Sequence, residues 1–252
     1  MSQTLQESPM NLSEHLEELR RKLIICAASI AILSAISFLF SDFLIEIISA
    51  PIMNHIYTLY FLSPYEAFVT KLKISIVTGV LISLPVIFTQ LWLFVAPGLR
   101  TREQQVILPL ALSSTLLFLI GGLFAYFAVI PFVLNFFLGF QSSALSPLIS
   151  IGSYVSFFLS FILVFGIVFD LPIVLVGLIW LGVVEASFLA CQRKWAVLSI
   201  FILAAVLTPT IDMLTQCLLA IPLWGFYELS ILIGREIEKR RGETSKVRTE
   251  VS

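Results

Sequence analysis

The acidic residues of this sequence are its best candidates for chemistry, and Asp170 is the most unusual of them. It lies inside a long apolar run, two residues before Pro172 and far from any polar segment. A charge at such a place in a membrane costs about 2.5–3.5 kcal/mol on insertion scales, so Asp170 is a candidate for binding a ligand or relaying protons. The alternative is a structural role, in which a protonated or hydrogen-bonded Asp170 joins neighbouring helices. The sequence leaves both roles open.

Two further acids, Glu18 and Glu103, lie close to basic residues and next to apolar runs. Carboxylates bind guanidinium groups through paired hydrogen bonds, so an acidic patch formed by these residues would suit a basic ligand. Glu18 has a simpler alternative, an i,i+4 ion pair with Lys22 on a solvated helix face. Glu103 has one as well, because the helix dipole stabilises an acid in the first turn of a helix.

Polar side chains also mark the last two apolar runs. Thr208 and Gln216 flank the turn between them, and Asp212 in that turn is predicted to cap the final helix. Because polar groups within a membrane favour hydrogen bonds to another helix, Thr208 with Gln216 is a candidate docking site for a partner. Glu228 lies near the end of the final run and could instead reach the water interface, so its role is ambiguous.

The sequence carries no catalytic or metal-binding motif that we recognise. It lacks H-E-x-x-H, G-x-S-x-G and a P-loop, and its three cysteines have neither metal-ligand nor disulfide spacing. The net charge of −1 provides no field that would attract nucleic acid. We therefore expect no enzymatic activity, no cofactor or metal, and no nucleic-acid partner.

The elements that must position these side chains are membrane helices. Of the 252 residues, 59% are hydrophobic and 12% charged, against about 45–50% apolar and 25% charged in a soluble domain. Runs of this length without period-two alternation predict helices, not barrel strands. We expect an all-α, polytopic protein with six transmembrane helices, at about 23–40, 74–95, 106–137, from the turn at 139–147 to 184, at 195–207 and at 213–233.

The distribution of basic residues predicts the orientation of these helices. Thirteen of the 15 Lys and Arg residues lie before the first helix, in alternate loops or in the tail. The opposite side holds only Lys71 and Lys73. By the positive-inside rule both termini are cytoplasmic. The chain is expected to form one domain, with a cytoplasmic segment at 1–22 and a charged, disordered tail at 235–252.

Several motifs resemble those of the TatC family and follow one another in the family's order over about residues 12–235. Trp92 and Phe94, predicted as membrane-interface aromatics, belong to one of them. The motifs are His15-Leu16-Glu17-Glu18-Leu19-Arg20; Phe61-Leu62-Ser63-Pro64-Tyr65-Glu66; Gln90, Trp92, Phe94, Pro97, Gly98, Leu99 and Glu103; Asp170 with Pro172; and Thr208-Pro209, Asp212, Gln216, Ile221-Pro222 and Glu228.

The resemblance implies a receptor that binds the twin-arginine signal peptides of folded cargo. It also implies that the proton-motive force drives the passage of this cargo across the membrane. It assigns Glu18, Arg20 and Glu103 to signal-peptide binding and Asp170 with Glu228 to the intramembrane polar groups. It also implies that Thr208 and Gln216 dock single-span Tat subunits of the TatA and TatB type, and that the chain self-associates in the complex. The expected location is the bacterial cytoplasmic (inner) membrane, although an organellar membrane fits the sequence equally well.

Two departures from the family pattern bear on these assignments. The outer turn Thr208-Pro209-Thr210-Ile211-Asp212 is one residue longer than the family's T-P-P-D, and position 170 carries Asp where the family often has Glu. The alternative function is a proton-coupled small-solute transporter that uses Asp170 as its proton relay. Such transporters favour internal repeats, and none is visible in this sequence.

Overall fold

The chain folds into a bundle of long helices. The structure, a computed structural model, describes residues 12–53, 58–95, 107–142, 147–208 and 212–250. Its elements, in order, are α1 (Leu12–Leu39), α2 (Ser41–Met53), β1 (Leu59–Tyr60), α3 (Glu66–Val95), α4 (Ile107–Phe124), the π-helix η2 (Ala125–Val129), α5 (Ile130–Leu138), β2 (Ile149–Ser150), α6 (Ile151–Trp180), α7 (Ala186–Cys191), α8 (Arg193–Leu207) and α9 (Met213–Glu250).

Helices occupy all six segments that the sequence predicts as spans. Within the described ranges, five helical segments are long and apolar enough to cross a membrane: Leu16–Leu39, Glu66–Phe94, Ile107–Leu138, Ile151–Trp180 and Met213–Lys239. The sixth predicted span is α8, whose 15 residues cover only about 22 Å at 1.5 Å per residue. The protein is therefore a polytopic, almost entirely helical membrane protein, and of its six predicted spans α8 is the short one.

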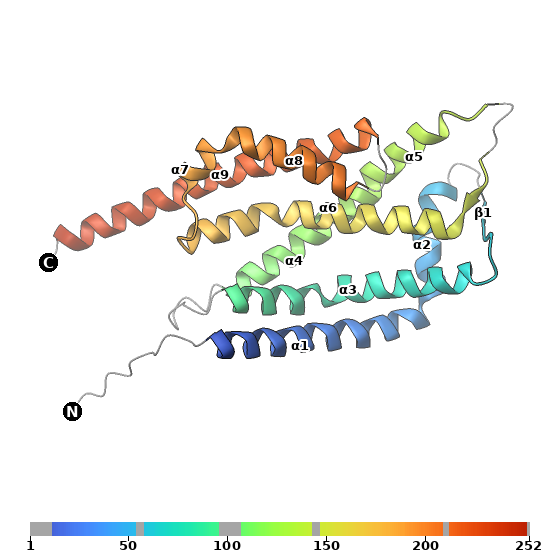
Figure 1. The fold of residues 1–252 in the computed structure, drawn as a ribbon, viewed down its shortest axis with the longest axis horizontal. Helices are drawn as coiled ribbons and strands as arrows, with labels where there is room; N and C mark the ends of the chain where they lie inside the picture. Colours follow the sequence, from blue (N-terminus) through green and yellow to red (C-terminus); the bar gives the residue numbers. More distant parts are fainter. Residues whose placement is uncertain (1–11, 54–57, 96–106, 143–146, 209–211, 251–252) are drawn as a thin grey trace.

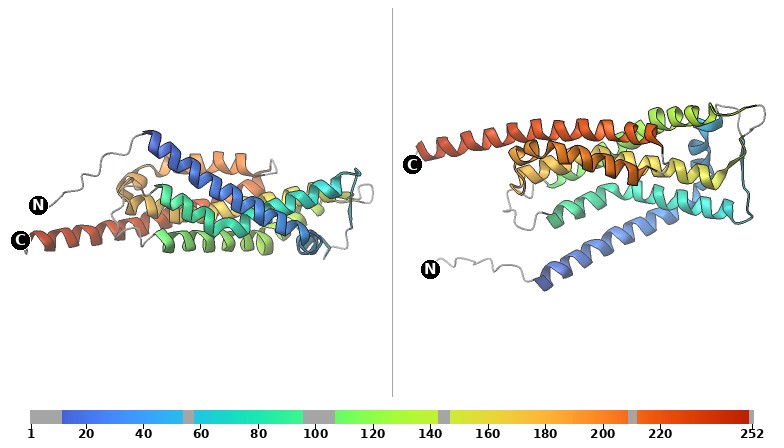
Figure 2. Two further views of the ribbon diagram at one scale, coloured as in Figure 1. Left: turned by 90° about the horizontal axis from the view of Figure 1, so that it is seen from below. Right: turned by 45° about the horizontal axis from the view of Figure 1, so that its top comes forward.

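Successive long segments run in alternating directions along the bundle (Figure 1). The beginning of α1, the end of α3 and the end of α9 lie at one end, whereas α2 and β1 lie at the other. One edge of the bundle is formed by α1, which packs against α3, and the other edge by α8 and α9 (Figure 2). The helix α6 lies between these edges and contacts α3, α4 and α9.

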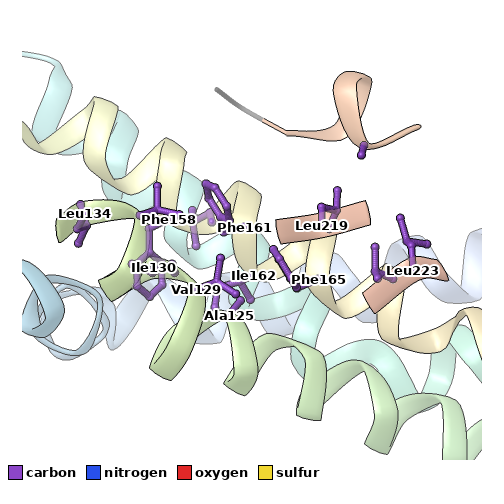
Figure 3. Packing of buried hydrophobic residues seen from close by; sticks show 14 of the residues in the cluster. Ala125, Val129, Ile130, Leu134, Phe158, Phe161, Ile162, Phe165, Leu219 and Leu223 are labelled. Carbon is purple, nitrogen blue, oxygen red and sulfur yellow. The ribbon is translucent and has the colours of Figure 1, made fainter. Parts of the chain in front are cut away.

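Aromatic and branched side chains fill the centre of the bundle around α6. Figure 3 shows side chains of η2 and α5 packed against Phe158, Ile162 and Phe165 of α6, with Leu219 and Leu223 of α9 in the same cluster. Elsewhere the helices approach through small residues. A Cβ added at Gly79 of α3 would collide with the backbone of Ser34 in α1, the close approach expected where helices pack in lipid.

Backbone groups at the start of α9 and at the end of α6 have hydrogen-bond partners in capping motifs. Asp212 caps α9, because its Oδ1 accepts a hydrogen bond of 2.8 Å from the backbone N–H of Thr215, which confirms the predicted cap. Past the end of α6, Gly182 adopts a φ of 75°, and the N–H of Val183 donates to the carbonyl of Leu178 at 3.0 Å. This pairing is a Schellman motif, which stops α6 before α7.

The final helix is longer than the predicted span. α9 continues as a helix to Glu250, into the segment at 235–252 for which disorder stays a prediction. The physical reason is that Glu, Lys and Arg are good helix formers, and extending an existing helix avoids the unfavourable nucleation step.

At the end of the bundle opposite the termini, two phenols fix α2 to the core. Pro51 lies inside α2 and has no N–H for the carbonyl of Ile47, four residues earlier. The hydroxyl of Tyr126 in η2 donates to that carbonyl at 3.0 Å. Tyr154 of α6 donates to the next carbonyl, that of Ile48, at 2.8 Å. Beyond the first predicted span, which ends at about residue 40, the structure thus has a further helix that extends to Met53.

Candidate functional site

The acids and bases near the start of α1 form a compact cluster with the end of α3. Glu18 Oε1 accepts a hydrogen bond of 2.5 Å from Lys22 Nζ, which confirms the i,i+4 pair that the sequence offers as the simpler role for Glu18. The Lys22 side chain is only 12% exposed, and its Nζ lies 5.6 Å from the ring centroid of Phe94. The ammonium group is thus held between a carboxylate and an aromatic ring.

The second carboxylate oxygen of Glu18 is the part of this cluster that could bind a ligand. Glu18 Oε2 is buried and has no hydrogen-bond partner among the residues that the structure describes. An ammonium binds a carboxylate as a point charge, whereas a planar guanidinium can bind both oxygens at once. Glu18 therefore retains an acceptor that suits an arginine side chain.

A shallow apolar hollow of about 390 Å³ runs along α1, on the face of the helix away from Glu18 and Lys22. Its lining residues share one face of the helix and are Leu16, Leu19, Arg20, Leu23, Ile24 and Ala27. Arg20 is exposed at this hollow, whereas Glu18 lies within the same turn but about 200° around the helix. The structure thus places these two predicted binding residues on different faces of α1.

Glu103, the third predicted binding residue, lies outside the described residues. The helices on either side of it, α3 and α4, end and begin at the end of the bundle where α1 begins (Figure 1). The proximity of Glu103 to Glu18 thus stays a prediction.

Asp170 is buried in α6, with only 6% of the residue exposed. The hydroxyl of Ser114 in α4 hydrogen-bonds to its carboxylate, and the indole N–H of Trp92 in α3 donates to Ser114 Oγ at 3.3 Å. Asp170 Oδ1 has no hydrogen-bond partner within the described part of the chain. Three helices are therefore joined by one polar chain that ends on a carboxylate oxygen able to accept a further hydrogen bond.

Two residues of this hydrogen-bonded series, Trp92 and Ser114, were not identified from the sequence. Trp92 was predicted as an interface aromatic, but it is 5% exposed, and its ring lies where a side chain on Gly177 of α6 would otherwise be. Its packing against this glycine could not be predicted, because the glycine opposite Trp92 is visible only in the fold. Ser114 is a polar residue inside an apolar helix, which is a usable signal for a membrane polar network.

Glu228, the ambiguous acid of the last span, forms an ion pair. Its Oε2 accepts a hydrogen bond of 2.8 Å from Arg193 Nη2 at the start of α8. Nearby, Glu238 Oε1 accepts from the backbone N–H of Ala186 in α7 at 2.8 Å. These two contacts tie the segment between α6 and α8 to α9, at the end of the bundle that holds the start of α1 (Figure 1).

The predicted docking residues Thr208 and Gln216 lie close to the turn between α8 and α9. The Gln216 amide donates to the carbonyl of Phe201 in α8 at 3.0 Å, and the Thr208 hydroxyl donates to the carbonyl of Ala204 at 2.9 Å. Both side-chain donors therefore hydrogen-bond to backbone carbonyls of α8. A glutamine carbonyl and a threonine hydroxyl nonetheless have acceptor capacity for a partner.

The described residues contain no group of three or more His, Cys, Asp or Glu side chains placed to hold a metal ion. What the structure offers is instead a pair of carboxylate sites. One is near the start of α1, and the other is inside the bundle on α6.

Comparisons with known proteins relate the whole bundle to one family. The family model described as "Sec-independent protein translocase protein (TatC)" matches residues 14–222. A protein of that name from Carboxydothermus hydrogenoformans is 42% identical over 236 residues, covering 94% of this chain and 97% of the relative. One from Aquifex aeolicus is 41% identical over 241 residues, covering 94% and 100%. A crystal structure of a twin-arginine translocase receptor, TatC, matches with a TM-score of 0.79 and 41% identity, covering 89% of this chain and 100% of the other.

Proposed function

This chain belongs to the TatC family, and we propose from that membership that it is the receptor subunit of a twin-arginine translocase. As such it binds the signal peptides of folded proteins and is not an enzyme. Its relatives in Carboxydothermus hydrogenoformans and Aquifex aeolicus are bacterial proteins. With the apolar helices, they support a location in the bacterial cytoplasmic membrane.

The proposed binding site is supported by Glu18 Oε2, which is buried and has no hydrogen-bond partner among the described residues. A twin-arginine signal peptide presents guanidinium groups that can bind a carboxylate in a bidentate way. Signal peptides continue from their basic region into an apolar stretch, and apolar residues of α1 follow Glu18 along the chain. We assign Glu18 and Glu103 as acceptors for the two arginines and Arg20 as a residue lining the same site.

Site-specific photo-crosslinking tests this assignment directly. A photoreactive residue at Leu16, which is 65% exposed at the hollow, should capture a twin-arginine signal peptide. The same residue at Phe127, which is 72% exposed in η2, is the matched control and should capture none. Excess unlabelled peptide with two arginines should abolish the Leu16 product, and a two-lysine peptide should not. Equal capture at both positions would place the binding site elsewhere.

The proposal includes six spans with both termini in the cytoplasm. The alternating directions of the helices (Figure 1) and the 13 basic residues on one predicted side support it. Reporter fusions after Thr101, Arg193 and Glu243 should report the cytoplasm, and fusions after Ser63, Ser143 and Thr210 the outer side. A cytoplasmic signal at Ser143 would break this arrangement, because the spans on either side of it, α4 to α5 and α6, would then not each cross the membrane.

The turn between α8 and α9 is the proposed docking site for small single-span Tat subunits. A helix of 15 residues is short against about 30 Å of hydrocarbon, so bilayer thinning or packing against another helix must compensate. Thr208 and Gln216 place polar acceptors there, and each interhelical hydrogen bond in a membrane contributes about 0.6–2 kcal/mol. Self-association with further copies of the chain belongs to the same proposal.

Gln216→Leu should change the crosslinks between α8 and a single-span partner in native membranes and reduce export. Thr208→Val should act in the same direction. Thr89→Val is its matched control, because the Thr89 hydroxyl also donates to the carbonyl four residues earlier, at 2.6 Å, but in α3. Unchanged crosslinks together with normal export in Gln216→Leu would rule out a polar docking site.

A further inference from the structure

The hollow along α1 faces away from the rest of the bundle. Lys22 contacts the Phe94 ring of α3, so the side of α1 that carries Lys22 is the side packed against α3. Arg20 lies two residues earlier and therefore about 200° around the helix. Because α1 forms an edge of the bundle (Figure 2), the hollow that Arg20 lines opens toward the surrounding bilayer. We propose that this hollow binds one anionic phospholipid, a function beyond signal-peptide binding.

The cation of the site is Arg20, at the edge of the first predicted span. Its side chain is exposed, and the ion pairs between described residues involve Lys22, Lys71 and Arg193 but not Arg20. The apolar run begins three residues later, at Leu23, and long basic side chains in such positions extend to the lipid headgroups. A guanidinium binds a phosphate through two parallel hydrogen bonds. An anionic headgroup is therefore a suitable ligand.

The charges around Arg20 favour an anion on balance. Glu18 is paired with Lys22 on the other side of the helix, so these two charges compensate each other. Glu17 and Arg21 are both exposed and flank Arg20 with opposite charges. With three bases and two acids, this stretch of α1 keeps a net charge of +1. A basic stretch next to a membrane helix attracts lipids with negative headgroups.

The apolar part of the hollow fits the chain of such a lipid. Leu23, Ile24 and Ala27 follow Arg20 on the same side of α1, and Ala27 lies about 10 Å deeper at 1.5 Å per residue. The small side chain of Ala27 leaves room beside the two larger ones. The hollow is shallow, so it holds one side of an acyl chain and leaves the other side in the bilayer. A soluble phosphate makes no use of this apolar surface, so a lipid is the expected ligand.

A lipid bound here fixes the depth of the start of α1. Glu18 lies within the same turn as Arg20, so a phosphate held by Arg20 sets the depth of Glu18 as well. Leu16 lies one turn before Arg20, on the side of the phosphate away from the span, and stays accessible to a peptide. Lipid binding does not depend on Glu18 being the acceptor for a signal peptide. The two proposals can therefore fail separately.

Photo-crosslinking with two lipids tests the site. A phosphatidylglycerol and a phosphatidylcholine with the same photoreactive acyl chain are placed in turn, at one mole fraction and one ionic strength, in nanodiscs of the full-length protein. The phosphatidylglycerol probe should label the segment with Leu23, Ile24 and Ala27 about fivefold more than the phosphatidylcholine probe, the effect of one base near anionic headgroups. Phe132 of α5, which is 51% exposed, is the reference for non-selective lipid contact and should be labelled equally by both.

Two pairs of variants separate the cation from the hollow. Arg20→Gln should remove the preference for phosphatidylglycerol. Arg21→Gln is its matched control, because it removes an exposed base that does not line the hollow, and it should keep most of the preference. Ala27→Leu fills the hollow and should lower labelling of the segment by both probes. Ala28→Leu is the control for it, since Ala28 is exposed outside the hollow.

Three results would overturn the proposal. Equal labelling by the two probes in the parent would mean non-selective lipid contact only. An equal loss of preference in Arg20→Gln and Arg21→Gln would assign the preference to diffuse surface charge. Protection of the segment from both probes would show that a second copy of the chain or another helix covers the hollow. A preference lost only in Arg20→Gln, with labelling lowered only in Ala27→Leu and unchanged thermal unfolding of all four variants, would establish the lipid site.

Discussion

Replacing Glu18 and Glu103 together by glutamine is expected to weaken binding of a twin-arginine signal peptide at least about a hundredfold. Each lost charge-assisted hydrogen bond is worth about 1.5–3 kcal/mol, or about ten- to a hundredfold in affinity. Charge reversal at either residue alone should produce a loss of the single-contact size. The measurement is the Kd of a labelled peptide for purified protein, compared at one fixed salt concentration because exposed charges are screened.

Glu17→Gln is the matched control for this experiment. Glu17 is the exposed neighbour of Glu18 on α1, so the change removes the same charge from the same turn without removing the proposed acceptor. Its effect should stay below about threefold, as for a screened surface charge. Membrane insertion should be normal in every variant. Parental affinity in the double Glu→Gln variant would show that the arginines bind elsewhere.

Asp170→Leu is expected to separate insertion from transport. The substitution removes an insertion cost of about 2.5–3.5 kcal/mol, so membrane abundance should equal or exceed that of the parent. Export of a twin-arginine reporter should nevertheless fall about tenfold or more, the equivalent of one lost charge-assisted contact. The reason is that Asp170 Oδ1 is the group here that can attract water, a ligand or a partner. Asp170→Glu should retain export, since it keeps the carboxylate.

Ser114→Ala shows whether the carboxylate or the polar chain is what matters. It removes the hydroxyl between Trp92 and Asp170 but leaves the acid in place. If Asp170 acts only as a structural link, Ser114→Ala and Asp170→Leu should lower thermal stability and export alike. If Asp170 has a role in transport, Ser114→Ala should retain most of the export. Normal export by the Asp170→Leu variant would show that Asp170 has only a structural role.

The helices could be predicted from the sequence because each prediction depends on local composition. A charge-free run long enough to cross hydrocarbon must satisfy its own backbone, and a helix does this within the run. The cap at Asp212 and the pair between Glu18 and Lys22 were predictable for the same reason, since their partners lie three and four residues away. Helix continuation past Gly234 was missed because charge content was taken as a sign of disorder.

The tertiary part of the two sites could not be predicted in this way. Phe94 reaches Lys22 only because α3 packs beside α1, and Ser114 reaches Asp170 only because α4 packs against α6. Neither contact has a fixed spacing along the chain. The sequence therefore identified the acids and the i,i+4 partner of Glu18, but not the ring beside Lys22 or the hydroxyl beside Asp170.

The pairing of Pro51 with Tyr126 has an evolutionary consequence. The proline creates an unsatisfied carbonyl at Ile47, and a hydroxyl 79 positions further along the chain supplies the missing donor. A lineage that replaces the proline regains the N–H of an ordinary helix, and its phenol then has no acceptor to serve. A lineage that loses the hydroxyl first carries an orphaned acceptor until the proline also changes. These two positions should therefore covary among relatives, with phenylalanine tolerated at position 126 chiefly where position 51 is no longer proline.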